Sequence, residues 1–158
     1  TAAGEKELTL TALIDVPRRN LYRCWTEREL LKQWFVPKPW TTARAELDVR
    51  PGGICLVVMR DPEGKECPNP GIYLEVIENE RLVTTDAYTE AWRPAEKPFM
   101  TLIVTFADED GPDGRTMIRY SARVLHWSEA DRKAHEEMGF HEGWKICTQQ
   151  LAETAAAL

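Results

Sequence analysis

The sequence has little of what marks a membrane, secreted or nucleic-acid-binding protein. No apolar run approaches the roughly 20 residues of a membrane-spanning helix, and residues 1–7 lack the charged-then-apolar pattern of a signal peptide. No run of lysine and arginine stands out, and the formal net charge is −6. Nucleic acid and membrane are therefore poor candidates as partners. We expect a cytoplasmic protein.

Residues that bind metals or act as nucleophiles are also sparse. The four cysteines form no Cys-x-x-Cys pair, which favours reduced, mostly buried thiols over a zinc or redox site. Of the three histidines, His135 and His141 are six residues apart and point about 240° apart on a continuous helix, so they cannot share an ion. No Gly-x-Ser-x-Gly elbow or glycine-rich phosphate loop is present. We expect no metal and no cofactor.

The composition is that of one soluble globular domain. The chain has 158 residues, of which 43% are hydrophobic and 29% charged. A chain of this length buries roughly 70% of its unfolded surface when it folds. We expect residues 1–158 to form a single domain.

The last thirty residues predict a long helix with a break. Ser128 followed by Asp131 is typical of a helix N-cap. Glycines at 139 and 143 disfavour a continuous helix, so we expect a break near 138–140 with a shorter helix before it. After the break, one apolar face recurs at three- and four-residue spacing and comprises Phe140, Trp144, Thr148, Leu151, Ala155 and Leu158.

The rest of the chain predicts one strand, two short helices and a run of strands. Residues 8–14 alternate as in a strand, Pro17 suits the start of a helix, and Thr26 with Glu29 predicts the cap of a second helix that ends at Pro37. Six strands separated by turns are then expected at 43–50, 54–60, 72–77, 81–88, 100–107 and 116–127. Strands joined by short turns pair antiparallel, and a twisted sheet of this size curls around a helix. The expected class is α+β: a helix-grip fold in which the meander packs across the C-terminal helix.

Several segments, in this order, resemble the bacterial relatives of the heat-shock-protein-90 ATPase activators, which belong to the START and birch-pollen-allergen-like superfamily (SRPBCC, polyketide-cyclase-like). The segments are Trp25-Thr26, Leu30–Phe35, Asp48–Gly53, Gly71–Val76, Glu80–Val83, Met138–Phe140 and Gly143-Trp144. The resemblance covers nearly the whole chain. It implies a cavity between the sheet and the C-terminal helix that holds an apolar molecule. The chain departs from the eukaryotic activators in having no separate N-terminal chaperone-binding domain, which argues against a chaperone partner.

Two residues are candidates for proton transfer. His126 shares the apolar face of strand 116–127, where a neutral imidazole either exchanges a proton with a ligand or makes a structural hydrogen bond. Glu75 and Tyr73 are two residues apart and so share one face of the expected strand 72–77. The sequence does not decide whether this face or the opposite one lines the cavity. For Asp48, which neighbours Arg50, a cross-strand ion pair is expected instead.

Aromatic residues are the better candidates for a ligand site, because six tryptophans are many for this length and rings line most small-molecule pockets. The candidate ligand-binding residues are Trp34, Phe35, Trp40, Tyr73, Tyr88, Trp92, Phe99, Tyr120, Phe140 and Trp144.

Three hypotheses follow. The first is a binding protein for a small apolar or aromatic molecule. The second is a cyclase or dehydratase that uses His126 or Glu75 as acid or base. The third is a chaperone-interacting module. A homodimer through strand 72–77 is an open alternative.

Overall fold

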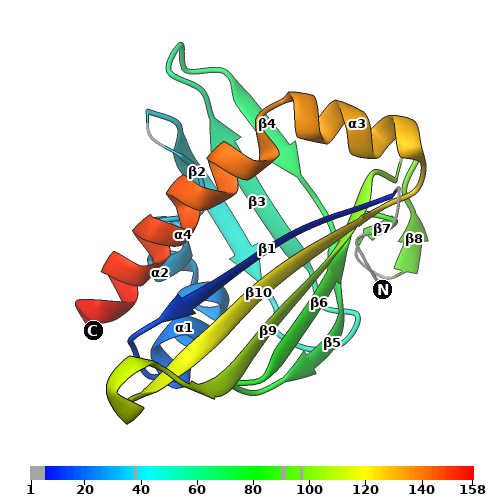
Figure 1. The fold of residues 1–158 in the computed structure, drawn as a ribbon. Helices are drawn as coiled ribbons and strands as arrows, with labels where there is room; N and C mark the ends of the chain where they lie inside the picture. Colours follow the sequence, from blue (N-terminus) through cyan, green and yellow to red (C-terminus); the bar gives the residue numbers. More distant parts are fainter. Residues whose placement is uncertain (1–5, 38, 90–91, 97) are drawn as a thin grey trace.

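The computed structural model describes residues 6–37, 39–89, 92–96 and 98–158, and Figure 1 shows their arrangement. A first strand and two short helices precede a series of antiparallel strands, and two helices close the chain. In order, the elements are β1 (Glu7–Ile14), α1 (Arg18–Thr26), α2 (Arg28–Leu31), β2 (Thr41–Leu47), β3 (Cys55–Arg60), β4 (Glu66–Asn69), β5 (Ile72–Ile77), β6 (Arg81–Thr85), β7 (Tyr88–Thr89), β8 (Arg93–Pro94), β9 (Met100–Asp110), the 3-10 turn η2 (Pro112–Gly114), β10 (Thr116–His126), α3 (Glu129–Glu137) and α4 (Phe140–Ala156). This is the predicted α+β order, with the long helix last.

The larger sheet has five strands in the order β1-β10-β9-β6-β5. All four neighbouring pairs are antiparallel, and β9 and β10 pair over their full length, from Thr116 opposite Asp110 to His126 opposite Met100. The first strand closes onto the last, with Leu8 opposite Val124 and Ile14 opposite Ile118. The sheet thus joins the two ends of the strand-forming part of the chain.

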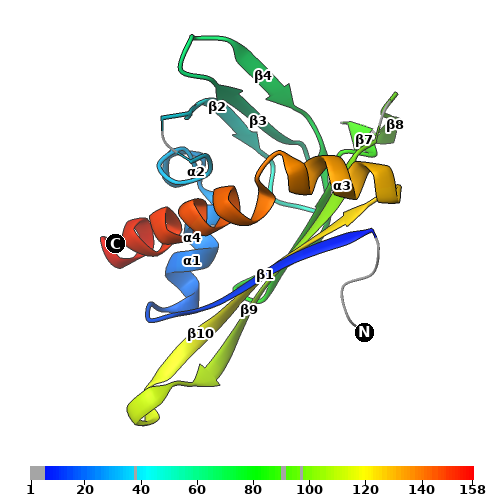
Figure 2. The same cartoon turned by 45° about the horizontal axis from the view of Figure 1, so that its top comes forward.

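The strands expected to form one meander are divided between two sheets. β2, β3 and β4 form a separate three-stranded sheet, which meets the larger one through an isolated bridge between Ile54 and Ile72. β4 lies between the strands expected at 54–60 and 72–77, where no strand was predicted, and it places Cys67 opposite Met59. Figure 2 shows the strands β2–β4 standing away from the larger sheet.

The expected helix cap and break are confirmed. The Ser128 hydroxyl accepts the backbone N–H of Asp131 at 3.1 Å, which satisfies one free amide of the first turn of α3. Gly139 adopts a left-handed conformation with φ +93° between α3 and α4. The break turns the apolar face of α4 onto the core.

Helix α4 packs beside α1 and against β1 (Figures 1 and 2). Its predicted face is buried at Phe140, Thr148, Leu151 and Ala155, and half-buried at Trp144, whereas Leu158 is exposed past the helix end. Asn20 of α1 donates its side-chain amide to the carbonyl of Ala155 at 3.1 Å. Among the described residues, no helix is long and apolar enough to cross a membrane.

The predicted cap of α2 is wrong. Glu27, not Thr26, precedes the first turn of α2, and it makes no side-chain cap bond. The Thr26 hydroxyl donates instead to the carbonyl of Tyr22 at 2.8 Å, because α1 continues through Thr26. Only Glu27 separates the two helices, so this one residue both ends α1 and precedes the first turn of α2.

Replacing Gly139 and Gly143 by alanine is expected to change the free energy of unfolding in opposite directions. Gly139→Ala is expected to lower the free energy of unfolding by about 1 kcal/mol, because a side chain disfavours its left-handed backbone although nothing would touch the new methyl group. Gly143→Ala is expected to raise it by about 0.5–1 kcal/mol, since this glycine lies inside α4 and also faces open space. Urea denaturation of both variants measures the difference, and two shifts of the same sign would contradict the assigned break.

Candidate functional site: a cavity between the two sheets

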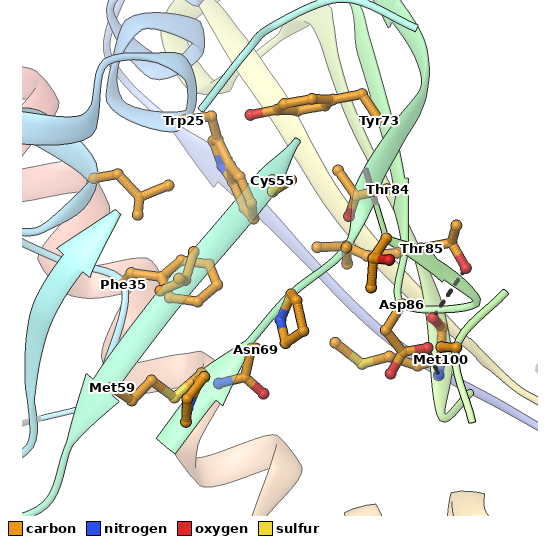
Figure 3. A pocket seen from close by; sticks show the side chains of 18 residues that line it. Trp25, Phe35, Cys55, Met59, Asn69, Tyr73, Thr84, Thr85, Asp86 and Met100 are labelled. Atoms are coloured by element: carbon orange, nitrogen blue, oxygen red, sulfur yellow. Dashed lines mark hydrogen bonds between the residues drawn. The ribbon is translucent and has the colours of Figure 1, made fainter. Parts of the chain in front are cut away.

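A cavity of about 330 Å³ lies between the three-stranded sheet and the larger sheet. Residues of β3 and β4 form one side, residues of β5, β6 and β9 form another, and the α1–α2 segment closes one end. Figure 3 shows Trp25, Phe35 and Met59 along one side, and Thr84, Asp86 and others along the opposite side. This volume is in the range of small-molecule sites in proteins.

The cavity is not where the sequence analysis expected it. None of the described residues that line it belongs to α3 or α4. The space between α4 and the larger sheet is filled instead, since Leu151, Ala155, Val124 and Tyr120 are all fully buried. The expectation of a cavity between the sheet and the C-terminal helix is therefore corrected to a cavity between two sheets.

Helix α4 nevertheless holds one wall of the cavity from behind. The Gln150 amide donates to the carbonyls of Trp34 at 3.0 Å and Val36 at 2.8 Å, and the Cys147 thiol donates to the carbonyl of Phe35 at 3.3 Å. These bonds tie the irregular segment after α2 to a rigid helix. The Phe35 ring, which lines the cavity, is positioned in this way.

An aromatic cluster forms the closed end. The rings of Trp25, Trp34 and Phe35 meet edge to face at centroid distances of 4.8–5.8 Å. The Trp34 indole N–H donates to the carbonyl of Cys24 at 3.0 Å, which fixes the ring in the core. Trp34 lies behind the wall, whereas Trp25 and Phe35 present their surfaces to the cavity. Edge-to-face packing holds these rings in place and leaves an apolar face for a guest molecule.

Two polar side chains in this region stay protonated at neutral pH. Burial raises the pKa of Tyr73 well above its ordinary value of 10, and its neighbour Cys55 raises it further. Burial also raises the pKa of the Cys55 thiol, to about 11, although a hydrogen bond from Tyr73 opposes this. Both residues line the cavity. At neutral pH they offer a phenol and a thiol, not a general base or a nucleophilic thiolate.

Polar side chains gather at the other end of the cavity. Asp86 accepts the backbone N–H groups of Phe99 at 2.8 Å and Met100 at 3.1 Å, both through Oδ1. The side-chain amide of Asn69 donates to the carbonyl of Cys67 at 3.1 Å. Thr84, Thr85 and Thr89 complete this end. An apolar body with a polar group at one end matches such a site.

His126 is buried where the sequence analysis placed it, but away from the cavity. Its Nδ1 lies 2.9 Å from the carbonyl of Lys6, so this nitrogen donates. Its Nε2 lies 2.9 Å from Nδ1 of His135. The rings of Phe99 and Phe140 pack around the pair. Both nitrogens of His126 are thus engaged, and its catalytic role stays a prediction.

The histidine pair predicts a loss of stability in acid. Burial and the neighbouring His126 lower the pKa of His135 to about 4 from its ordinary 6.5. Between these pH values the unfolded chain binds a proton at His135 and the folded chain does not, so the free energy of unfolding falls as the pH drops from 6.5 to 4. His135→Gln is expected to flatten this part of the dependence, as measured by urea midpoints at several pH values. The exposed His141, paired with Glu136, provides the control variant His141→Gln. Equal slopes for wild type and His135→Gln would contradict the assignment.

The remaining predicted site residues are dispersed. Glu75 lies outside the cavity lining and pairs with Arg81 at 2.9 Å. Asp48 pairs with Arg50 at 2.7 Å within its own corner rather than across strands. His141 contacts the carboxylate of Glu136 at 3.2 Å, across the break between α3 and α4. Of the ten predicted aromatics, the lining includes Phe35 and Tyr73.

The other eight aromatics occupy three kinds of place. Tyr88 and Trp92 form an exposed edge-to-face pair at a centroid distance of 5.8 Å. The rest are Trp34, Tyr120 and Phe140 in the core, Phe99 and Trp144 half-buried, and Trp40 exposed.

The Tyr120 hydroxyl and the Trp25 indole nitrogen are buried, and neither has a hydrogen-bond partner among the described residues. Burial raises the pKa of Tyr120, and the adjacent Trp25 nitrogen opposes this. The two groups are therefore near one another but not aligned as a hydrogen bond.

Several residues of the cavity were missed from the sequence. Trp25 appeared only in the Trp25-Thr26 segment that resembles the family, and Asp86 was not among the candidate site residues. Met59, Asn69, Met100 and Leu102 gave no signal, since strand residues meet across two sheets only in the folded chain. No group of three or more metal-ligating side chains occurs in the part of the chain that the structure describes.

The comparison with protein families decides the family. The profile described as "Activator of Hsp90 ATPase homolog 1-like protein" matches residues 15–156. The chain belongs to this family. The resemblance stated from the motifs, which places the chain in the SRPBCC superfamily, is thereby confirmed. Members of this superfamily commonly bind hydrophobic ligands. No curated protein matches the sequence.

Solved structures of bacterial proteins share the fold of this AHSA1-like chain. Protein NE0264 from Nitrosomonas europaea is 42% identical, with a TM-score of 0.89 over 98% of this chain and 96% of that one. Protein Ms6760 from Mycobacterium smegmatis is 23% identical, with a TM-score of 0.74 over 94% and 90%. A Rhodobacter sphaeroides protein is 16% identical, with a TM-score of 0.81 over 100% and 97%. At 23% and 16% identity the likeness concerns the fold alone.

Proposed function

We propose that this chain binds a small apolar or aromatic molecule in the cavity between its two sheets. The observation that carries the proposal is the cavity itself, with about 330 Å³ of space, an aromatic end and a polar end. The rings of Trp25 and Phe35 and the side chains of Val57, Met59 and Leu102 supply apolar surface for a guest. Apolar walls with a few placed polar groups are the usual make-up of a ligand site.

Binding is favoured over catalysis by what the cavity lacks. Neither His126 nor Glu75 is among the described lining residues, and both have partners elsewhere. Tyr73 does line the cavity, but its raised pKa leaves it a hydrogen-bond donor and not a base. Asp86 is the one carboxylate in the described lining, and its Oδ1 is held by two backbone N–H groups, so the cyclase or dehydratase hypothesis would depend on its other oxygen as the base. Within the described ranges of the chain, no feature favours the chaperone-interacting module.

The proposal is tested by finding what the protein carries. The wild-type protein is purified under native conditions, denatured, and its extract analysed by small-molecule mass spectrometry. We expect an apolar compound at near-stoichiometric amounts in the wild type. It should be depleted from a variant whose cavity is filled, Val57→Phe combined with Leu102→Phe. Identical extracts from the two proteins would contradict the proposal.

A further inference from the structure

The described lining of the cavity carries negative charge and no positive charge. Among its described lining residues, Asp86 carries a formal charge, and lysine, arginine and histidine are absent. The remaining polar side chains of the lining are neutral. A guest molecule that enters this site therefore meets a negative group and no described side chain that neutralises it.

The Asp86 carboxylate is held in a fixed orientation with one oxygen left over. Oδ1 accepts two backbone N–H groups at 2.8 and 3.1 Å, from Phe99, which precedes β9, and from Met100, its first residue. Within residues 6–37, 39–89, 92–96 and 98–158, no group donates to Oδ2. Figure 3 shows the carboxylate on the far side of the cavity from Trp25 and Phe35. One oxygen thus serves the structure, and the other is available to a guest.

The neighbouring polar groups are uncharged. Asn69 donates one amide hydrogen to the carbonyl of Cys67, which leaves its second amide hydrogen as a donor and its carbonyl oxygen as an acceptor. The Thr85 hydroxyl is engaged by Thr101 and by the N–H of Ala87. The Thr84 hydroxyl rotates and serves either role. Among the described lining residues at this end of the cavity, Asp86 is therefore the one group whose charge favours one kind of head group.

We infer that the guest of this cavity carries a hydrogen-bond-donating head group without negative charge, an amine above all, and that the free oxygen of Asp86 binds it. The inference rests on the proposed function. An ammonium group beside Asp86 would make a charge-assisted hydrogen bond, and a neutral hydroxyl a weaker one. A carboxylate in the same place would meet the like charge of Asp86, so fatty or aromatic acids are poor guests.

The test uses one aromatic body with three head groups. Naphthalene, 1-naphthylmethylamine, 1-naphthalenemethanol and 1-naphthoate are titrated into the wild-type protein at neutral pH and low salt, and Kd is measured by NMR chemical-shift changes. We expect the amine to bind about tenfold or more tightly than the acid, with the alcohol between them. In Asp86→Asn the amine and the acid should bind within about threefold of each other, while naphthalene binds as in the wild type.

Controls keep the outcomes distinct. Glu63→Gln removes the same charge from the exposed β3–β4 turn and should preserve the wild-type preference. If naphthalene binds and the wild type does not prefer the amine, or if Asp86→Asn keeps the preference, the inference is overturned and the proposed function stands. If naphthalene and its derivatives do not bind at all, the proposed function fails, and the inference with it. If Asp86→Asn does not fold, the ratio of the Kd values for the acid and the amine in the wild type still tests the inference.

Discussion

Filling the cavity with Val57→Phe and Leu102→Phe together is expected to weaken the binding of naphthalene by about 30-fold or more. The two residues line the cavity from different sheets, so two added rings take up space from both sides. Because the new rings enter empty volume, the free energy of unfolding should change by less than about 1 kcal/mol. Titration of the double variant and its thermal unfolding measure the two effects.

A matched variant places the same ring outside. This variant is Leu74→Phe. Leu74 lies on β5, adjacent to the cavity residue Tyr73, but its side chain is exposed. It should bind naphthalene as the wild type does. Unchanged binding by the double variant would mean that the probe occupies some other place. Loss of folding in the double variant would be addressed with Leu102→Phe alone.

Replacing Leu151 with alanine is expected to lower the free energy of unfolding by about 3 kcal/mol. Leu151 is completely buried at the centre of α4, so the substitution removes apolar contacts and leaves an empty space. The effect should be larger than that of any single change on the cavity wall, because the wall already borders empty space. Urea denaturation followed by circular dichroism measures it.

The same helix supplies the control. Ile146 lies on the outer side of α4 with 38% of its surface exposed, and Ile146→Ala should cost less than about 1 kcal/mol. Equal losses for the two variants would contradict the packing of α4 onto the sheet.

The C-terminal helices could be predicted because their signals are local. A serine cap, a glycine that adopts a left-handed conformation and a repeat of apolar residues each act within one or two turns of helix. The structure has all three, at Ser128, Gly139 and Phe140 to Ala155. The chain order of strands and helices followed from similarly local alternation and turns.

Strand alternation failed at two irregularities. The register shifts between Tyr73 and Glu75 in β5 and between Thr42 and Arg44 in β2. A bulge puts one extra residue into a strand, so the alternation of faces changes across it. This is why Tyr73 lines the cavity, whereas Glu75, two residues further on, lies outside its described lining and pairs with Arg81.

The place of the cavity depends on contacts between distant segments. The larger sheet closes through β1 and β10, which leaves β2–β4 as a separate sheet and opens the space between them. The number of aromatic residues predicted an aromatic ligand site, but it did not predict which residues line the cavity. Trp25 and Asp86, which lie at opposite ends of the cavity, belong to an N-terminal helix and to the turn after β6.

The most direct test of the central claim is an NMR titration of the wild-type protein with naphthalene, with the backbone amides assigned. A guest between the two sheets predicts saturable shifts concentrated at the lining residues of β3, β6 and β9, and their disappearance in the Val57→Phe, Leu102→Phe variant. Shifts confined to α4 and the exposed Tyr88–Trp92 pair, or no saturable shifts at all, would contradict it.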